Sequence, residues 1–299
     1  MAISTVRVNI SGVWTNLELN KETGKYEGVI VAPSITSYNL LGGYYPVTIE
    51  AANDAGTILT KDDTDLEIGN DLRLIVKERV KPVITLVYPS DGAYIQNANA
   101  QIIFRVKDEV NGSGVKEDSI IFSVDGEETA VTKEAVENGY ECTYTPPEAM
   151  EDGEHTISIQ AEDNDGNVAD RIDVTYTIDT IPPTLTLSAP TFSITNQPEC
   201  AVEGQTNDNL STPVTVDVAL NGQEAQVIPV EEDGSFYMTL TLSEGDNEIK
   251  VISTDLSGRS TTIIKTVKLD TTIPRITNVV FEPNPTSTSQ PVRIVLEVV

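Results

Sequence analysis

The motif GEHTISIQAEDNDG (153–166) has two further copies in the chain, GYYPVTIEAANDAG (43–56) and GDNEIKVISTDLSG (245–258). Each copy starts and ends with glycine, has apolar residues at its fifth and seventh positions, and has Asn or Asp at its eleventh position. Apolar residues two positions apart indicate a β-strand with one buried face, and Asn or Asp shortly before glycine indicates a tight turn. The sequence therefore contains three copies of one strand-and-turn unit.

The rest of the chain favours strands as well. Signals for helices are nearly absent, and short alternating runs rich in Val, Ile, Thr and Tyr lie between turn dipeptides. We therefore predict an all-β fold made of tandem Ig-like antiparallel β-sandwiches, arranged end to end. The turn dipeptides are Asp125-Gly126, Asn138-Gly139, Asp165-Gly166, Asn221-Gly222 and Asp233-Gly234.

Prolines mark the expected joints between domains. They occur at Lys81-Pro82, in IDTIPP (178–183) and in LDTTIP (269–274). Proline suits the first residue of an edge strand, which need not donate a hydrogen bond to the sheet. Domains of this size class have about 100 residues. We therefore predict complete domains at 82–181 and 182–273.

The two ends of the chain are expected to be incomplete domains. Only 11 residues precede Gly12, whereas 40 or more separate the entry proline from the matching glycine in the two complete domains. The N-terminal domain, 1–81, is therefore predicted to lack its first two strands (A and B) and to carry an insertion near 57–70. The segment 274–299 is predicted to be an A–B strand pair of a further, incomplete domain.

The final stretch, QPVRIVLEVV (290–299), must be covered by something, because its alternate residues are apolar as on the buried face of a strand. Three explanations stay open. The segment 274–299 of one copy, or of a separately encoded neighbour, completes the N-terminal domain of the next copy head to tail. The sequence is a fragment of a longer protein, or the insertion near 57–70 folds back as a substitute strand. The candidate assembly residues are Val292, Ile294, Leu296 and Val298.

The chain is strongly acidic, with 47 Asp and Glu against 19 Lys and Arg and a net charge of −28. Such a surface repels nucleic acid and anionic membranes but attracts divalent cations. No basic and apolar leader follows Met1 and no run of about 18 apolar residues occurs, so neither a signal peptide nor a membrane span is predicted. Cys142 and Cys200 fall in different predicted domains and are expected to stay reduced.

The acidic turn EDNDGN (162–167) raises the question of calcium binding. The EF-hand pattern does not fit, because two of its ligand positions would fall on apolar residues. Asp163 and Asp255 are expected mainly to bind the backbone of their own turns. The alternative is a Ca²⁺ site at a domain joint, with Asp163, Asp165 and Asp179 as oxygen ligands.

Two other stretches have a structural interpretation beside a functional one. The acidic stretch TKDDTDLE (60–67) is interpreted as a charged loop rather than a cation site. Trp14, Tyr38, Tyr44 and Tyr45 could stack on a sugar ring, but alternating strand positions explain them as core or cross-strand residues.

Catalysis is not predicted. The one histidine, His155, lies near the start of a predicted strand and is expected to be a surface residue, although a pair with Cys142 is conceivable. No G-x-S-x-G, Walker A, dinucleotide-binding or C-x-x-C pattern occurs. No catalytic or cofactor-binding residue is therefore assigned, and the protein is predicted not to be an enzyme.

Several stretches resemble the bacterial Ig-like superfamily of tandem sandwich modules. They are GEHTISIQAEDNDGN (153–167), NGSGVKEDSIIFSVDG (111–126), and the joints DTIPP (179–183) and DTTIP (270–274). This resemblance covers most of residues 82–273 and implies the sandwich fold, but it says little about function.

A narrower resemblance concerns the N-terminal domain. STVRVNISGVWTNLELNKETGKYEG (4–28) and YNLLGGYYPVTIEAANDAG (38–56) resemble Ig-like proteins encoded in the tail gene clusters of phages and prophages of Firmicutes. That resemblance implies a virion component made in the bacterial cytoplasm, which acts as a spacer, assembly element or weak adhesive toward proteins or a cell-surface glycan. The alternative is a bacterial cell-surface or secreted adhesin that binds host glycan or protein.

Overall fold

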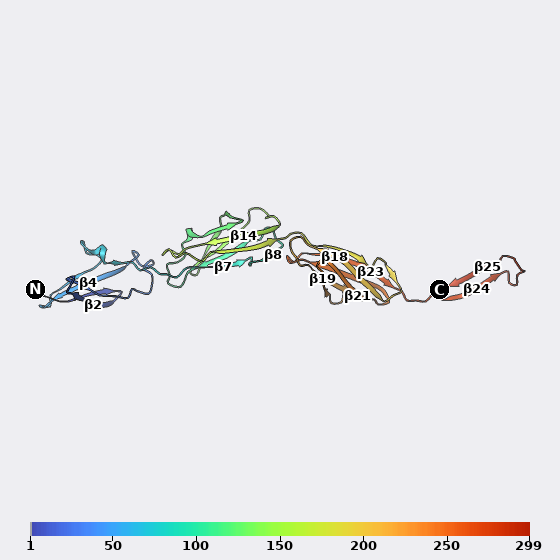
Figure 1. Ribbon diagram of the computed structural model, residues 1–299, viewed down its shortest axis with the longest axis horizontal. Coiled ribbons are helices and arrows are strands. Elements are labelled where there is room, and N and C mark those ends of the chain that lie inside the picture. Colours follow the sequence, from blue (N-terminus) through green and yellow to red (C-terminus); the bar gives the residue numbers. More distant parts are fainter. Residues whose placement is uncertain (1) are drawn as a thin grey trace. The chain divides into compact units, whose positions relative to one another are not determined.

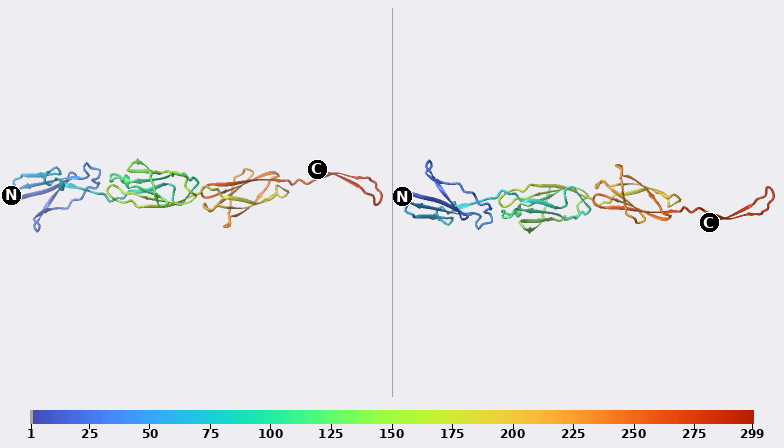
Figure 2. Two further views of the ribbon diagram at one scale, coloured as in Figure 1. Left: turned by 90° about the horizontal axis from the view of Figure 1, so that it is seen from above. Right: turned by 90° about the horizontal axis from the view of Figure 1, so that it is seen from below.

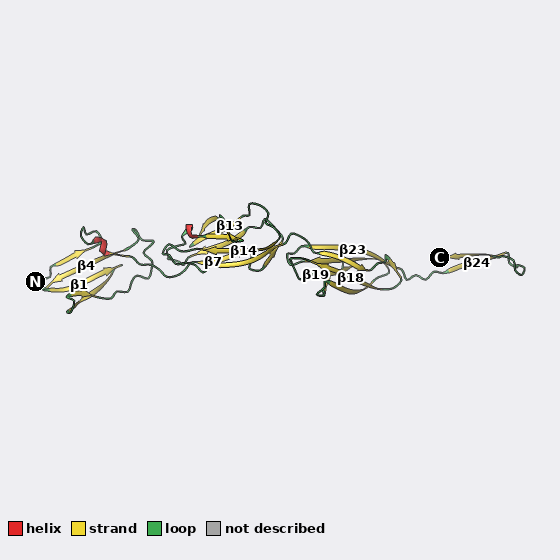
Figure 3. Cartoon of the chain, turned by 45° about the horizontal axis from the view of Figure 1, so that its top comes forward, coloured by secondary structure: helices red, strands yellow, loops and turns green. Residues whose placement is uncertain are grey.

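The computed structural model describes residues 2–299, which divide into two compact units, Met1–Ile178 and Asp179–Val299. The predicted fold class is confirmed, because the described residues form mainly antiparallel β-sheets and no α-helix. Two short 3₁₀ turns, η1 (Gly69–Leu72) and η2 (Glu117–Ser119), are the helical segments of this part of the chain and are red in Figure 3. Neither is long and apolar enough to cross a membrane.

The first unit begins with a single antiparallel sheet. Its strand order is β3-β2-β1-β4-β5, and β6 pairs with the start of β4. The sheet is blue in Figure 1, where β2 and β4 are labelled. The N-terminal copy of the repeated motif supplies β4, and Val8 of β1 lies opposite Ile49 of β4. The strands are β1 (Ile3–Ile10), β2 (Val13–Asn20), β3 (Lys25–Glu27), β4 (Tyr45–Asn53), β5 (Ile58–Lys61) and β6 (Arg73–Leu74).

A two-layer sandwich completes the first unit. One layer has the order β12-β13-β9-β7 and the other β11-β10-β14-β15-β8. Phe104 of the first layer stacks on Phe122 of the second, with 5.4 Å between ring centroids, at the centre of the core. The short strand β8 pairs in parallel with β15. The strands are β7 (Val83–Tyr88), β8 (Ala93–Ile95), β9 (Ile102–Lys107), β10 (Ile121–Val124), β11 (Glu127–Glu128), β12 (Thr132–Val136), β13 (Gly139–Tyr144), β14 (Gly153–Gln160) and β15 (Ile172–Ile178).

The second unit contains a similar sandwich, and the layers of both can be followed in Figure 2. Its sheets have the orders β16-β18-β21 and β17-β23-β22-β19-β20. Val202, Val216 and Ile249 are 0% exposed between them, and β17 pairs in parallel with β23. The strands are β16 (Thr184–Ala189), β17 (Ile194–Thr195), β18 (Glu199–Asn207), β19 (Thr215–Leu220), β20 (Gln226–Ile228), β21 (Ser235–Thr241), β22 (Gly245–Thr254) and β23 (Ser260–Leu269).

The second unit ends in an exposed hairpin of β24 (Ile276–Glu282) and β25 (Arg293–Val298). β24 and β25 begin to pair at Ile276 and Val298, shortly after the joint proline. β7 and β9 begin to pair at the equivalent place, shortly after the joint proline of the first sandwich. The alternating apolar residues of β9, Ile102, Phe104 and Val106, are 1%, 0% and 0% exposed. Those of β25, Ile294, Leu296 and Val298, are 59%, 52% and 57% exposed. The hairpin therefore has the apolar alternation of a strand pair that forms a core, but its apolar residues are exposed.

The described residues before β7 form a single sheet, whose apolar residues are shielded from water to different degrees. Val8 and Ile49 take the places of Phe122 and Ile159, a cross-strand pair that is 1% and 0% exposed in the complete sandwich. In the first sheet, Val8 is 7% exposed and Ile49 is half-buried. The insertion does not replace the missing strands, because β5 extends the same sheet by pairing with β4.

Glycines at one repeated position show where a neighbouring strand passes. A Cβ atom on Gly139 would lie 2.0 Å from the carbonyl oxygen of Val106 in β9, and one on Gly234 would lie 2.2 Å from that of Thr206 in β18. A Cβ on Gly24, the matching residue before β3, would meet nothing within 4 Å. The strand that crosses this position in both sandwiches is thus absent over the first sheet.

Matched truncations should separate a packed strand from an uncovered one. Phe104→Ala is expected to destabilise the first sandwich by about 3–5 kcal/mol, because it removes a buried ring and leaves a cavity. Leu296→Ala, on the corresponding strand of the hairpin, should leave monomeric protein nearly as stable as wild type. Amide hydrogen exchange in β9, β14 and β25 measures both effects, and equal losses in the monomer would contradict the exposed state of β25.

Candidate metal centre

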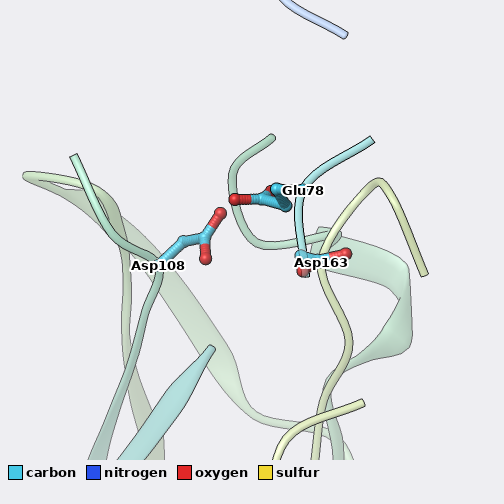
Figure 4. Close-up of side chains that lie close together, drawn as sticks. All are labelled: Glu78, Asp108 and Asp163. Carbon is cyan, nitrogen blue, oxygen red and sulfur yellow. The ribbon is translucent and has the colours of Figure 1, made fainter. Parts of the chain in front are cut away.

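Three carboxylates from separate segments of the first unit converge where β9 and β14 end. The Glu78 cluster consists of Glu78, Asp108 and Asp163, and one carboxylate oxygen of each lies within 4.8 Å of the other two. Glu78 lies in the segment between β6 and β7, Asp108 directly follows β9, and Asp163 lies in the turn after β14. Figure 4 shows the carboxylates of Glu78 and Asp108 directed toward each other, with Asp163 beside them.

The cluster is buried and only partly hydrogen-bonded. Asp108 is 7% exposed, Asp163 is 0% exposed and Glu78 is half-buried. The backbone N–H of Gly114 donates to Asp108 Oδ2 at 2.7 Å, and the N–H of Ser113 donates to Glu78 Oε1. Asp108 Oδ1 and Glu78 Oε2 are buried without a hydrogen-bond partner. Two oxygens of the cluster therefore lack a donor.

A fourth carboxyl group, that of Glu109, adjoins the cluster and stays mostly protonated at neutral pH. Glu109 Oε2 is also buried without a hydrogen-bond partner. Burial, together with the neighbouring carboxyl groups of Glu78 and Asp108, raises the pKa of Glu109 to about 8. The ion pairs that the described residues form involve other carboxylates. The charge of the cluster is thus left without a basic side chain opposite it.

The spacing of the oxygens suits a large divalent cation. Ca²⁺ binds oxygen ligands at about 2.3–2.6 Å, so two of its ligands can stand up to about 5 Å apart. The oxygens of the cluster all lie within 4.8 Å of one another, which meets this requirement.

The cluster lies among contacts that connect the N-terminal sheet region with the first sandwich. Asp165 Oδ2 accepts hydrogen bonds from the hydroxyl of Thr36 and from the backbone N–H of Glu78, the latter at 3.0 Å. The side-chain amide of Asn39 donates to the carbonyl oxygen of Gly112 at 2.6 Å. An ion bound by Glu78 and Asp108 would therefore add to an existing joint.

The second unit carries a corresponding set, the Asp179 cluster, formed by Asp179, Asp208 and Asp255. Asp179 lies five residues before β16, Asp208 directly follows β18, and Asp255 is the eleventh residue of the repeated motif. The members of the Glu78 cluster occupy the same three positions in the first sandwich. Asp179 Oδ2 and Asp255 Oδ2 are buried without a hydrogen-bond partner. Here Arg259 stands where the first sandwich has Asn167, so this cluster has a basic residue in its turn.

Of the three ligands predicted from sequence, Asp163 belongs to the Glu78 cluster and Asp165 accepts hydrogen bonds from Thr36 and Glu78. Asp179 belongs to the Asp179 cluster of the second unit. Metal binding by these residues stays a prediction. Glu78 and Asp108 were not predicted as ligands from the sequence, although the equivalent residues of the second sandwich, Asp179 and Asp208, are also acidic.

The expected turn structure of the acidic motifs is confirmed. Asp163 and Asp255 each accept a hydrogen bond from the backbone N–H four residues later, at 2.8 and 3.0 Å. The closing glycines, Gly166 and Gly258, have φ values of 93° and 88°, which favour glycine. The hydrogen bonds of the turns thereby orient the carboxylate groups of Asp163 and Asp255.

The stretch 60–67 consists of the end of β5 and the charged loop that follows it. Lys61 forms ion pairs with Asp65 at 3.0 Å and with Glu67 at 3.3 Å. Asp62 accepts hydrogen bonds from the backbone and the hydroxyl of Thr64. These local partners support the interpretation as a loop rather than as a cation site.

His155 is buried, contrary to the expectation that it is a surface residue. It is 8% exposed because it lies on the same strand face as Ile157 and Ile159. Its Nδ1 lies 2.7 Å from Asp125 Oδ2, and its Nε2 lies 2.8 Å from the carbonyl oxygen of Glu151. Burial alone would lower the pKa of His155, but these two hydrogen bonds outweigh burial and the pKa is raised.

The cysteines carry no activated thiol. Cys142 and Cys200 are both free and 0% exposed, in agreement with the expected reduced thiols. Burial raises the pKa of Cys142 to about 11, so the thiol stays protonated at neutral pH. Both ring nitrogens of His155 are already bound to oxygen atoms, so the conceivable Cys–His pair is not formed.

The aromatic residues of the first sheet have structural partners. Tyr45 is 9% exposed, and Tyr44 donates its hydroxyl to an aspartate at 3.0 Å. Trp14 lies 4.3 Å below the guanidinium group of Arg7, which pairs with a glutamate across the sheet. Tyr38 is 49% exposed. Tyr45 is therefore a core residue and Trp14 a cross-strand residue, as expected, whereas Tyr38 and Tyr44 lie outside the strands.

Two parts of the chain match models of known families. Residues 79–180 match the bacterial Ig-like domain, and residues 183–271 match domain B of glucodextranase. The two matches coincide with the two sandwiches. Domains of the Ig-like and fibronectin-III-like fold are typically non-catalytic.

The chain is similar to parts of several known proteins. Bacillopeptidase F of Bacillus subtilis (strain 168) is 31% identical over 192 residues, which are 63% of this chain but only 12% of that protein. The fibronectin(III)-like modules of CbhA from Clostridium thermocellum match 62% of this chain and 94% of theirs, with 18% identity and a TM-score of 0.41. A tetra-tandem repeat from the extending region of a large adhesion protein matches 98% of this chain and 79% of its own, with 17% identity and a TM-score of 0.31.

The single histidine allows a clean test of the buried pair. An NMR titration of the His155 ring should give a pKa above the usual value of about 6.5, and Asp125→Asn should lower it, whereas Asp170→Asn on the surface should not. Because the folded pKa is raised, the pair stabilises the sandwich fully below about pH 6.5 and loses this effect as the pH rises through the folded pKa. A pKa unchanged by Asp125→Asn would contradict the assigned interaction.

Proposed function

We propose that this chain is a non-enzymatic structural and adhesive Ig-like protein, whose domains act as spacer and assembly modules. Two tandem sandwiches support such a role. The groups most suited to catalysis, the thiol of Cys142 and the ring of His155, are buried and held in structural interactions. The function must therefore lie in surfaces rather than in a reactive group.

The apolar faces of the first sheet and of the β24–β25 hairpin support the assembly part of this proposal. In the first sheet, Val8 is 7% exposed and Ile49 is half-buried at the place where the complete sandwich has its second layer. The hairpin presents Leu296, which is 52% exposed, where the complete sandwich has the fully buried Phe104. Exposed apolar sheet faces tend to associate, because burying them removes apolar area from water.

The two faces are complementary halves of the same domain type. The first sheet lacks the layer that contains β7 and β9 in the complete sandwich, and β24–β25 is the counterpart of that pair. An isolated two-stranded hairpin is only marginally stable in water. We therefore assign the hairpin of one copy to the open face of the first sheet in a second copy. Such a head-to-tail contact is heterologous, so it builds a ring or a filament rather than a twofold dimer. Ile294 and Val298 would lie in this contact with Leu296, whereas Val292 lies just before β25.

Two locations are compatible with this role. A place in a phage or prophage tail rests on the resemblance of the N-terminal sequence, and synthesis in the bacterial cytoplasm follows from it. The match to the bacterial Ig-like domain is equally compatible with a cell-surface or secreted adhesin that binds a host glycan or protein. Neighbouring genes distinguish the two, because tail genes support the virion and a sortase or exporter gene supports the adhesin.

Assembly can be tested with charges placed on opposite faces of one strand. Sedimentation equilibrium of the full chain is expected to show oligomers that grow with concentration. Leu296→Asp buries a charge in the apolar contact and should weaken association by about tenfold or more. Val295→Asp introduces the same charge on the other face of β25 and should have a much smaller effect.

Three results would contradict this assembly. The chain would stay monomeric at all concentrations, the two aspartate variants would behave alike, or Leu296→Asp would weaken association without faster hydrogen exchange in β1 and β4. The last comparison matters because it identifies the first sheet as the surface covered.

A further inference from the structure

We propose that the Glu78 cluster is a calcium site that fastens the joint between the N-terminal sheet region and the first sandwich. Its ligands would be one carboxylate oxygen each from Glu78, Asp108 and Asp163, completed by water and backbone carbonyl oxygens. This inference is independent of the assembly proposed above.

The first argument is the unsatisfied buried charge. Asp108 is more than nine-tenths buried, yet its Oδ1 has no donor, and Glu78 Oε2 beside it has none either. An ionised carboxylate buried without a partner is costly, so such groups are normally paired or bound to metal. A divalent cation between these oxygens removes the cost at both of them at once.

The second argument is that the fold holds the ligands in place before any ion binds. Asp163 receives the backbone N–H and the side-chain amide of Asn167 at 2.8 and 2.7 Å, and Asp108 receives the N–H of Gly114. These donors orient each carboxylate and leave Asp108 Oδ1 and Glu78 Oε2 free of donors. A fixed set of ligands loses little conformational freedom when the ion binds.

The third argument is the repetition of the set in the second sandwich. Asp179, Asp208 and Asp255 occupy the same three positions and again leave buried oxygens without donors. A chance accumulation of surface acids would not be expected to recur at three equivalent places far apart in sequence. Because Arg259 brings a positive charge to that turn, we assign the stronger binding to the Glu78 cluster.

The location of the site defines what the ion would do. Glu78 belongs to the segment that connects the two regions, whereas Asp108 and Asp163 belong to the sandwich. The same segment is held by Asp165, which binds the N–H of Glu78 and the hydroxyl of Thr36. An ion shared by Glu78 and Asp108 thus ties this segment to the sandwich and reduces motion at the joint.

Calorimetric titration of the calcium-free full chain with CaCl₂ at 0.15 M NaCl tests the proposal directly. We expect a binding event with a dissociation constant on the order of 10⁻⁴–10⁻³ M, as in extracellular calcium modules. Asp108→Asn keeps the shape of the side chain and its bond to Gly114 but removes the charge, and should abolish this event. Asp173→Asn, an equal change on the exposed face of β15, should leave it intact, and MgCl₂ should not replace CaCl₂.

Hydrogen exchange gives a second readout that does not depend on the heat of binding. Calcium should slow exchange at residues 76–80, 108–114 and 163–167 in wild type and in Asp173→Asn, but not in Asp108→Asn. Far-UV circular dichroism verifies that each variant is folded. The proposal is overturned if wild type binds no calcium up to about 10 mM, if Asp108→Asn binds as wild type does, or if bound calcium leaves the exchange of these segments unchanged.

Discussion

A β-sheet with one apolar face is stable in water only when a second layer covers that face. In the two complete sandwiches this layer is present, and residues such as Phe104, Phe122 and Val202 are almost fully excluded from water. The terminal hairpin has the same alternation of apolar residues but presents it to solvent, whereas in the first sheet Val8 is buried and Ile49 is half-buried. The proposed association would remove the exposed apolar face of the hairpin from water.

The strands and turns could be predicted because their signals are local. Alternation with period two, a closing Asp or Asn, and a glycine with positive φ are all contained within a few residues, as Asp163 and Gly166 show. Strand pairing is not local. Gly24 matches Gly139 in sequence, yet β3 pairs with β2 in the first sheet, whereas β13 pairs with β9 in the sandwich. The sequence near Gly24 does not reveal that the crossing strand is missing.

The candidate metal centre shows the same division between local and distant information. The role of Asp163 in its turn could be predicted from the sequence, because the hydrogen-bond donor and acceptor are only four residues apart. The approach of Glu78 and Asp108 depends on the path of the chain into β7 and out of β9, which only the folded sandwich determines. The burial of His155 was not predicted, for a different reason. Its alternation with Ile157 indicated burial, but its polar ring suggested the surface, and two oxygen acceptors in the interior resolve that conflict.

The parallel pairing within each sandwich has a mechanical consequence. β8 near the entry of the first sandwich pairs in parallel with β15 at its exit, and β17 pairs with β23 in the second. Tension applied to the two ends of such a domain pulls the paired strands in opposite directions along their length. Their hydrogen bonds are then loaded in shear and must break together, instead of opening one after another like a zipper. With both cysteines free, this clamp resists stretching without any covalent cross-link between the layers.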